Sequence, residues 1–353
     1  MDTVTQAALG ACIAQAGFSE RLGRKALVVG TVCGLLPDFD VLLSVGSDHF
    51  TYLQTHRGWS HSLLVLPIIA LFIAWLAMKW ATRPKAQLAT PVPSHINNFG
   101  VWYLLCFLTL ITHPLLDLFT TYGTQIFTPL SNARYTLDGV SIIDPIYTVP
   151  LLIAIIIGLI RKKPIKDRKW AVTALVFSSA YLGFGLTNSL EAKKQANMQL
   201  TQHNFQAVDL RSSPTMFNTL LWRIVAKDKD GHFAVGFFST VTKKPIEFTF
   251  YKNSENELIN QALNSEQGKI LRWFSTDLLR AELSESENGH KQVILTDMRF
   301  GLVTNPVSSF FIGVFEFDNN KKLLEISSTK ADQDPIEPDK ELKSIWSMIW
   351  PDS

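Results

Sequence analysis

Six side chains able to bind a metal ion occur at three places in the first 120 residues. They are two carboxylates in "GLLPDFD", two imidazoles in "HRGWSHS" and one of each in "HPLLD": Asp38, Asp40, His56, His61, His113 and Asp117. Because His113 and Asp117 are four residues apart, a helix would place both on one face. Mixed imidazole and carboxylate ligands suit zinc, with manganese or iron as alternatives. The three motifs together predict a metal site, although each motif alone also fits a helix end or an interfacial anchor.

Such a site would support hydrolysis. A divalent ion with an open coordination position lowers the pKa of bound water toward ~7 and polarises the bond under attack. Whichever of Asp38 and Asp40 is not a full ligand is then the candidate general base. Arg57 and Arg134 carry guanidinium groups, which suit a phosphate or carboxylate, but contact with lipid headgroups would explain these arginines equally well.

The segments that carry these residues are apolar. The chain is 47% hydrophobic and 18% charged, and its first 190 residues contain only nine of the 31 Asp and Glu. Four segments come near the ~20 apolar residues that cross a bilayer, which predicts membrane spans at 63–81, 100–119, 145–160 and 170–190. Residues 5–18 and 25–43 are also apolar, and the sequence leaves open whether they span the membrane, re-enter it or lie at its surface.

The cations predict an orientation. Twelve of the 14 Lys and Arg in the first 190 residues fall within 21–25, 79–85 and 161–169, which can all share one side of the membrane. By the positive-inside rule that side is the cytoplasm. The six candidate ligands would then lie at the extracytoplasmic face, close to membrane lipids.

The order of the motifs resembles a known family. "MDTVTQAALGA", "GLLPDFD", "HRGWSHS", "THPLLDLFTTYGT" and "SIIDPIYT" are similar to the YdjM-like family, bacterial inner-membrane-associated proteins predicted to be metal-dependent hydrolases. The resemblance is dense over about residues 1–190 and continues in "SPTMFNTLLWRIV" and "TDMRFG". That family is distantly similar to zinc-dependent phospholipase C and to fungal zinc nucleases, helical phosphoesterases whose metals are held by histidines and aspartates.

The resemblance implies a ligand set and a location. By motif, the ligands would be Asp38, Asp40, His56, His61, His113 and Asp117, with Asp144 of "IIDP" as a weaker candidate. Gln6 stands where many relatives have a histidine, so one ligand is missing and the number of zinc ions, one or two, stays open. The implied location is the bacterial inner membrane, crossed several times.

The second half of the chain predicts a soluble module of strands and helices instead of membrane spans. Aromatic and β-branched runs predict strands of an antiparallel sheet at 232–241, 246–251, 291–301 and 309–318. Residues 255–264 and 269–283 have helical apolar spacing. After four spans this module would be extracytoplasmic, on the side of the metal ligands, where it could cover them. It is slightly acidic without a basic stripe, so we expect no nucleic-acid partner, and no protein partner is indicated.

The sequence therefore predicts a mainly α protein with a polytopic helical membrane domain, residues 1–190, and a smaller soluble α+β module, residues 191–353. The first functional hypothesis is a membrane-embedded metal-dependent hydrolase acting on a phosphoester of lipid or envelope origin. The alternative is a non-catalytic membrane protein with a structural metal and a partner-binding module. An open coordination position would favour the hydrolase, and a closed four-ligand site would favour the alternative.

Overall fold

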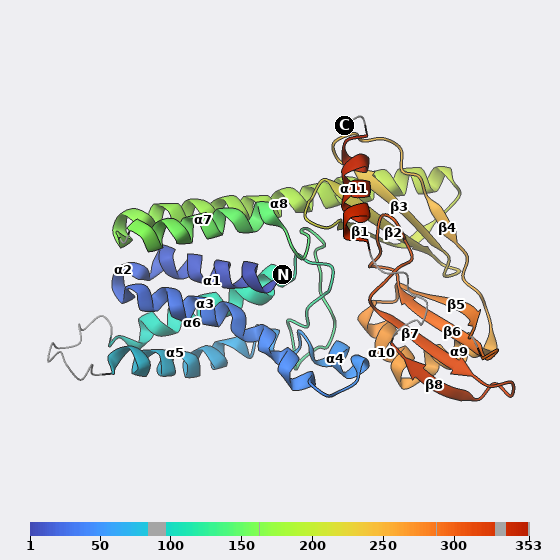
Figure 1. Ribbon diagram of the computed structural model, residues 1–353, viewed down its shortest axis with the longest axis horizontal. Helices are drawn as coiled ribbons and strands as arrows, with labels where there is room; N and C mark the ends of the chain where they lie inside the picture. The colour runs from blue at the N-terminus through green and yellow to red at the C-terminus, as the bar shows by residue number, and fades with distance from the viewer. Residues whose placement is uncertain (84–96, 162, 287, 329–336, 352–353) are drawn as a thin grey trace. The chain divides into compact units, whose positions relative to one another are not determined.

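The chain forms two compact units (Figure 1). The computed structural model describes residues 1–83, 97–161, 163–286, 288–328 and 337–351, so the predicted cytoplasmic cations Lys85 and Lys162 lie outside the described residues. The first unit comprises Met1–Val45, Thr55–Leu186 and Met216–Asn218, and the second comprises Gly46–Gln54, Thr187–Thr215 and Thr219–Ser353. The first is helical and the second contains antiparallel sheets, which confirms the predicted fold class.

The first unit is a bundle organised around its first helix. Its helices are α1 (Thr3–Gly17), α2 (Ser19–Leu22), α3 (Arg24–Leu35), α5 (Leu66–Thr82), α6 (Phe99–Asp117), α7 (Pro145–Arg161) and the first part of α8 (Pro164–Gln202). Two 3₁₀ helices, η1 (Leu36–Ser44) and η2 (Trp59–His61), lie between α3 and α5. The side chain of Asp2 caps α1, which packs against α3, α6 and α7. The two apolar segments of undecided role are therefore helices within this bundle.

The four predicted spans differ in whether their helices are long and apolar enough to cross a membrane. Among the described residues, α6 and α8 are long and apolar enough to cross a membrane. Residues 49–61 and helix α5 would add a third crossing if this pair, bent by 68°, forms one span, while α7 is a shorter apolar helix. Large apolar side chains are exposed along α5 and α7, among them Phe72, Trp75, Ile153 and Ile156, as expected of a surface that faces lipid.

Helices α1 and α3 pack through small residues. Gly30 and Gly34, four residues apart on α3, face Gly10 and Gln6 of α1. A Cβ atom added at Gly30 would lie 2.5 Å from the carbonyl oxygen of Gly10, and one at Gly34 would lie 2.5 Å from that of Gln6. Such small-residue stripes let apolar helices approach backbone to backbone. This contact fixes the end of α3, from which Asp38 follows.

The second unit contains two four-stranded antiparallel sheets with their strands in chain order. The first sheet comprises β1 (Ala207–Pro214), β2 (Leu221–Asp228), β3 (Phe233–Ser239) and β4 (Thr249–Tyr251). The second comprises β5 (Leu279–Glu285), β6 (Lys291–Asp297), β7 (Ile312–Phe317) and β8 (Leu323–Ser327). The helices of this unit are α4 (His49–Thr55), α9 (Glu257–Asn264), α10 (Glu266–Phe274), α11 (Pro338–Ile349) and the end of α8.

The predicted strands correspond to β3, β4, β6 and β7, whereas one predicted helix is wrong in its second half. Residues 269–274 are helical, in α10, but the segment from Leu279 onward is strand β5. Leu279 pairs with Asp297 and Ala281 with Leu295, and the two β5 side chains are buried. Pairing with a neighbouring strand thus decides this segment, although its apolar spacing also fits a helix.

The close approach of α1 and α3 predicts a large difference between two glycine-to-alanine substitutions. Gly30→Ala should lower the free energy of unfolding by roughly 1–3 kcal/mol, because the new methyl group overlaps the backbone of α1. Gly183→Ala is the matched control, since a Cβ there meets no atom within 4 Å. Thermal unfolding in detergent would measure both, and equal melting temperatures for the two variants would contradict this packing.

Candidate metal centre

The last turn of α6 provides two of the predicted ligands. His113 and Asp117 lie four residues apart on one face of the helix, and both side chains are fully buried. His113 Nε2 lies 3.6 Å from Asp117 Oδ2. The helical spacing seen in "HPLLD" therefore brings the imidazole and the carboxylate together.

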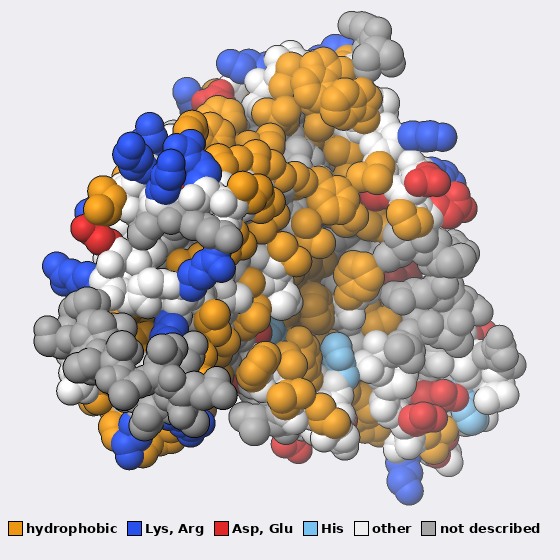
Figure 2. Space-filling view, turned by 60° about the vertical axis from the view of Figure 1, so that its left-hand side comes forward, with side chains coloured by type: hydrophobic (Ala, Val, Ile, Leu, Met, Phe, Trp, Pro, Cys, Tyr) orange, Lys and Arg blue, Asp and Glu red, His pale blue; other side chains and the backbone are white. Residues whose placement is uncertain are grey.

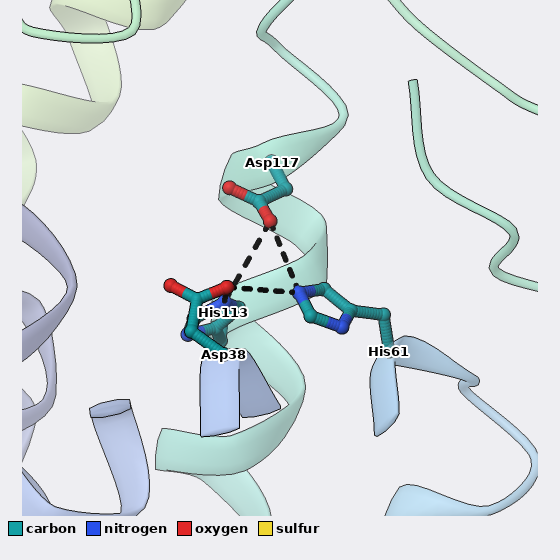
Figure 3. Close-up of side chains that lie close together, drawn as sticks. All are labelled: Asp38, His61, His113 and Asp117. Carbon is teal, nitrogen blue, oxygen red and sulfur yellow. Dashed lines mark ion pairs between the residues drawn. The ribbon is translucent and has the colours of Figure 1, made fainter. Parts of the chain in front are cut away.

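Two further ligands come from the turns between α3 and α5. Asp38 lies in η1, directly after Pro37, and its Oδ1 is 3.3 Å from His113 Nε2 and 3.4 Å from His61 Nε2. His61 lies in η2, and its Nε2 is 3.3 Å from Asp117 Oδ2. Figure 3 shows the four side chains converging on one point from these separate elements.

The spacing of these atoms suits one metal ion. Each of the four residues offers one ligand atom, and all four atoms lie within 4.8 Å of one another. For a tetrahedral ion with ligands at about 2.0–2.1 Å, neighbouring ligand atoms are separated by roughly 3.3–3.4 Å. The four nitrogen–oxygen distances, 3.3 to 3.6 Å, come close to that separation. The cluster could therefore hold a metal ion with little movement.

The hydrogen bonds around His113 and His61 point their Nε2 lone pairs into the cluster. His113 Nδ1 donates to the Gly34 carbonyl oxygen at 2.6 Å, because a carbonyl can only accept. Ser60 donates its one proton to Asp40 Oδ2 at 2.6 Å, so it accepts from His61 Nδ1, 2.9 Å away. In the neutral form of either ring, Nε2 then carries the lone pair that a metal ion would bind. Within the described structure neither Nε2 makes a hydrogen bond, nor does Asp117 Oδ2, although all three atoms are buried.

Asp40 and His56, both predicted ligands, lie beside the four-residue cluster rather than in it. Asp40 Oδ1 binds His56 Nδ1 at 2.8 Å, and Asp40 Oδ2 accepts from Ser60 and from the Arg57 backbone at 2.9 Å. Burial would raise the pKa of Asp40, but the contacts with His56, His61 and Ser60 together outweigh burial and hold the pKa below its ordinary value. An ionised Asp40 thus fixes the "HRGWSHS" turn and orients His61, as outer residues of metal sites do.

Asp117 also contacts donors that do not belong to the cluster. Its Oδ1 contacts the Met1 ammonium and accepts from Gln6 Nε2 at 3.1 Å, while Arg57 Nε lies 3.0 Å from Oδ2. Gln6 therefore orients one of the four ligands. For Asp38, burial would raise the pKa, but contacts with His113 and His61 hold it well below its ordinary value.

Two arginines and a tyrosine, Arg57, Arg134 and Tyr122, extend the site beyond the four ligands. Both guanidinium carbons lie 4.8 Å from the Tyr122 ring centroid. Arg57 has a left-handed backbone, φ 60°, and donates to Thr120, while Arg134 donates to the Gly123 carbonyl oxygen. No sequence pattern indicated Tyr122 or Thr120, because both lie in the long loop after α6.

Asp144, the weaker predicted ligand, lies outside the cluster. Its Oδ1 accepts from the Ile146 backbone at 3.0 Å at the start of α7, and its Oδ2 accepts from the Tyr181 hydroxyl at 3.0 Å. An aspartate directly before a helix commonly caps its free backbone N–H groups. Asp144 therefore joins α7 to α8.

Comparison with known proteins identifies a family and two relatives that resemble this chain. The YdjM inner membrane protein family matches residues 1–192. The chain is 24% identical over 294 residues to the uncharacterized protein YfhP of Bacillus subtilis strain 168, covering 77% of this chain and 81% of YfhP. It is 26% identical over 134 residues to the inner membrane protein YbcI of Escherichia coli K12, covering 37% of this chain and 69% of YbcI. No solved structure matches the chain.

Substitution of a histidine in the four-residue cluster should weaken zinc binding more than substitution of a histidine beside it. His61→Ala should weaken zinc binding by more than ~100-fold, because it removes an inward-facing ring nitrogen. His56→Ala should weaken binding only about 10-fold, the lower end for an outer residue. A titration of the full-length protein in detergent against a zinc chelator measures both affinities. Equal affinities for these two variants would contradict the assignment of His61 as a ligand and His56 as an outer residue.

Proposed function

The chain belongs to the YdjM inner membrane protein family, and we propose that it is a membrane-embedded, metal-dependent hydrolase. One observation carries the proposal. Two imidazole nitrogens and two carboxylate oxygens meet in one cluster, in which three buried atoms have no hydrogen bond among the described residues. The ligands would be Asp38, His61, His113 and Asp117. Zinc suits this mixed donor set best, and manganese is the alternative.

Access to the cluster is through Asp38. The Asp38 side chain is 22% exposed, whereas those of His61, His113 and Asp117 are fully buried. A divalent ion at such a site supplies a nucleophilic water at neutral pH and polarises the bond under attack. Asp38 faces the cluster through Oδ1, so we assign its second oxygen as the proton acceptor. Asp40, the other candidate base, has both oxygens engaged by His56, Ser60 and the Arg57 backbone.

The surrounding charges favour an anionic substrate, and we assign a phosphoester. Arg57 and Arg134 flank Tyr122, so two guanidinium groups stand close together beside the cluster. Guanidinium groups bind phosphate oxygens in pairs and stabilise the charge that develops in phosphoryl transfer. Because the site belongs to a membrane protein, a lipid or envelope-derived phosphoester is the substrate class we propose.

A structural metal is the alternative, and one observation favours it. Four protein ligands are enough to close a tetrahedral zinc site, and closed sites are structural. In that case the protein would be non-catalytic, and the second unit would bind a partner. The partial exposure of Asp38 favours the hydrolase, because a catalytic site needs one position that solvent and substrate can reach.

Hydrolysis of chromogenic and lipid substrates tests the proposal. Zinc-loaded full-length protein should release p-nitrophenol from bis(p-nitrophenyl) phosphate and cleave a fluorescent phospholipid. Asp38→Asn should lower kcat/KM at saturating zinc by at least ~100-fold, because it removes the proton acceptor together with the negative charge of a metal ligand. Glu20→Gln, a change at an exposed carboxylate of α2, is the control and should leave kcat/KM unchanged.

The outcomes separate the two functions. A wild-type protein that binds zinc stoichiometrically but cleaves neither phosphoesters nor p-nitrophenyl butyrate would overturn the hydrolase and support the structural metal. Cleavage of the butyrate ester alone would support a hydrolase but overturn the proposed phosphoester substrate.

The orientation is a separate prediction. Truncations that end at Arg83 and Arg161, fused to a reporter, should report a cytoplasmic position, because exposed cations gather at those helix ends. A truncation that ends at Leu130, in the loop after α6, should report an extracytoplasmic position. A cytoplasmic signal at Leu130 would place the metal cluster on the cytoplasmic side instead.

A further inference from the structure

A cavity of about 150 Å³ lies in the first unit at the end of the bundle where the cations gather. It is lined by Gln15 of α1, Ser19 of α2, the start of α3, the end of α7 and Asp167 of α8. Figure 2 shows lysine and arginine side chains gathered on the side of the molecule that is on the left in Figure 1. Helix α3 begins beside the cavity and ends beside Asp38, about 18 Å further on for 12 residues. The cavity is therefore separate from the metal centre.

Gln15 gives this cavity a polar atom without a partner. Its side chain is only 3% exposed, and its Nε2 donates to the Ala154 carbonyl oxygen at 2.9 Å. Because that carbonyl can only accept, the amide cannot be reversed, and Gln15 Oε1 must face elsewhere. Within the described structure this buried oxygen has no hydrogen-bond partner. A buried acceptor of this kind requires a donor, such as a hydroxyl group.

Arg24 supplies positive charge at the cavity wall. It uses one guanidinium nitrogen to donate to the Leu159 carbonyl oxygen at 3.2 Å, and a guanidinium group has further N–H donors to offer. The one carboxylate lining the cavity, Asp167, is already paired with Arg161 at 3.2 Å and with the Lys163 backbone at 2.8 Å. The charge left at the wall of the cavity is therefore positive.

An apolar track leads away from this polar end. Val28 and Val32 follow Arg24 at intervals of four on α3, and both are about half exposed, at 52% and 49%. On α7, Ile156 and Ile160 are exposed at 52% and 71%. These side chains suit acyl chains, whereas a soluble phosphate compound would gain nothing from them.

We propose that this cavity binds the headgroup of an anionic phospholipid, with Arg24 on the phosphate, Gln15 Oε1 accepting from a headgroup hydroxyl, and the acyl chains along α3 and α7. A cavity of 150 Å³ holds a group about the size of benzene, which suits a glycerol headgroup. Basic pockets between membrane helices on the cytoplasmic side are known sites for anionic headgroups. Phosphatidylglycerol has a net negative charge and hydroxyl donors in its headgroup, whereas phosphatidylcholine is zwitterionic, with no net charge, and its headgroup has no donor.

Calorimetry on the full-length protein in nonionic detergent tests this proposal with three probes: dihexanoyl phosphatidylglycerol, dihexanoyl phosphatidylcholine and inorganic phosphate. Phosphatidylglycerol should bind at one molecule per chain, and phosphatidylcholine at least tenfold more weakly. Inorganic phosphate should show no measurable binding at the same concentrations. Equal binding of the two lipids would overturn the headgroup site, and phosphate binding as tight as that of phosphatidylglycerol would overturn the lipid as ligand.

Two variants connect the binding to these residues. Arg24→Gln should weaken phosphatidylglycerol at least tenfold, whereas Arg21→Gln, an exposed cation outside the cavity lining, should change the affinity twofold or less. Gly158→Ala should also weaken binding, because its Cβ would lie 2.5 to 2.7 Å from the Gln15 amide and displace it. Unchanged zinc affinity shows that each variant is folded. Equal effects of Arg24→Gln and Arg21→Gln would show that the binding depends only on general surface charge, which would contradict the proposal.

Discussion

The carboxylate of Asp117, fully buried at the end of an apolar helix, is the constraint on which the site depends. A charge in such a place costs several kcal/mol unless partners compensate it, so the surrounding elements must deliver them. Arg57 reaches it from a strained turn with φ 60°, and Gln6 reaches it from α1. These partners leave Asp117 Oδ2 directed at two imidazoles and at Asp38. The contacts that offset the cost of burying the Asp117 charge also bring the four cluster residues together.

The small-residue contact between α1 and α3 serves the same arrangement. It sets the end of α3 so that the Gly34 carbonyl oxygen accepts from His113, and η1 then places Asp38 opposite the ring. Helices that approach so closely leave little freedom at their ends. The opposite end of α3 carries Arg24 and the cationic surface. The metal cluster thus lies beside the end of α3, and the positive charge lies at the start of the same helix.

Much of this could be predicted from local pattern. The spacing of four residues in "HPLLD" predicted that His113 and Asp117 share a face, and β-branched and aromatic runs predicted strands β3, β4, β6 and β7 but not β1, β2 and β8. The roles of Asp40 and His56 could not be read in this way, because only the fold decides which of two neighbouring carboxylates points inward. Asp144 remained a weaker ligand candidate in the sequence, because its bond with Tyr181, 37 residues further on, follows only from the packing of α7 and α8. Strand β5 was missed for a related reason, since its partner β6 lies further along the chain.

Zinc-edge X-ray absorption on the zinc-loaded, full-length protein tests the central claim most directly. The cluster predicts two imidazole nitrogens at about 2.0–2.1 Å, with the multiple scattering typical of two histidine rings, and oxygen ligands at about 2.0–2.2 Å. His61→Ala should reduce the imidazole contribution to one ring. A sulfur shell at about 2.3 Å, or a spectrum without imidazole scattering, would contradict a site built from Asp38, His61, His113 and Asp117.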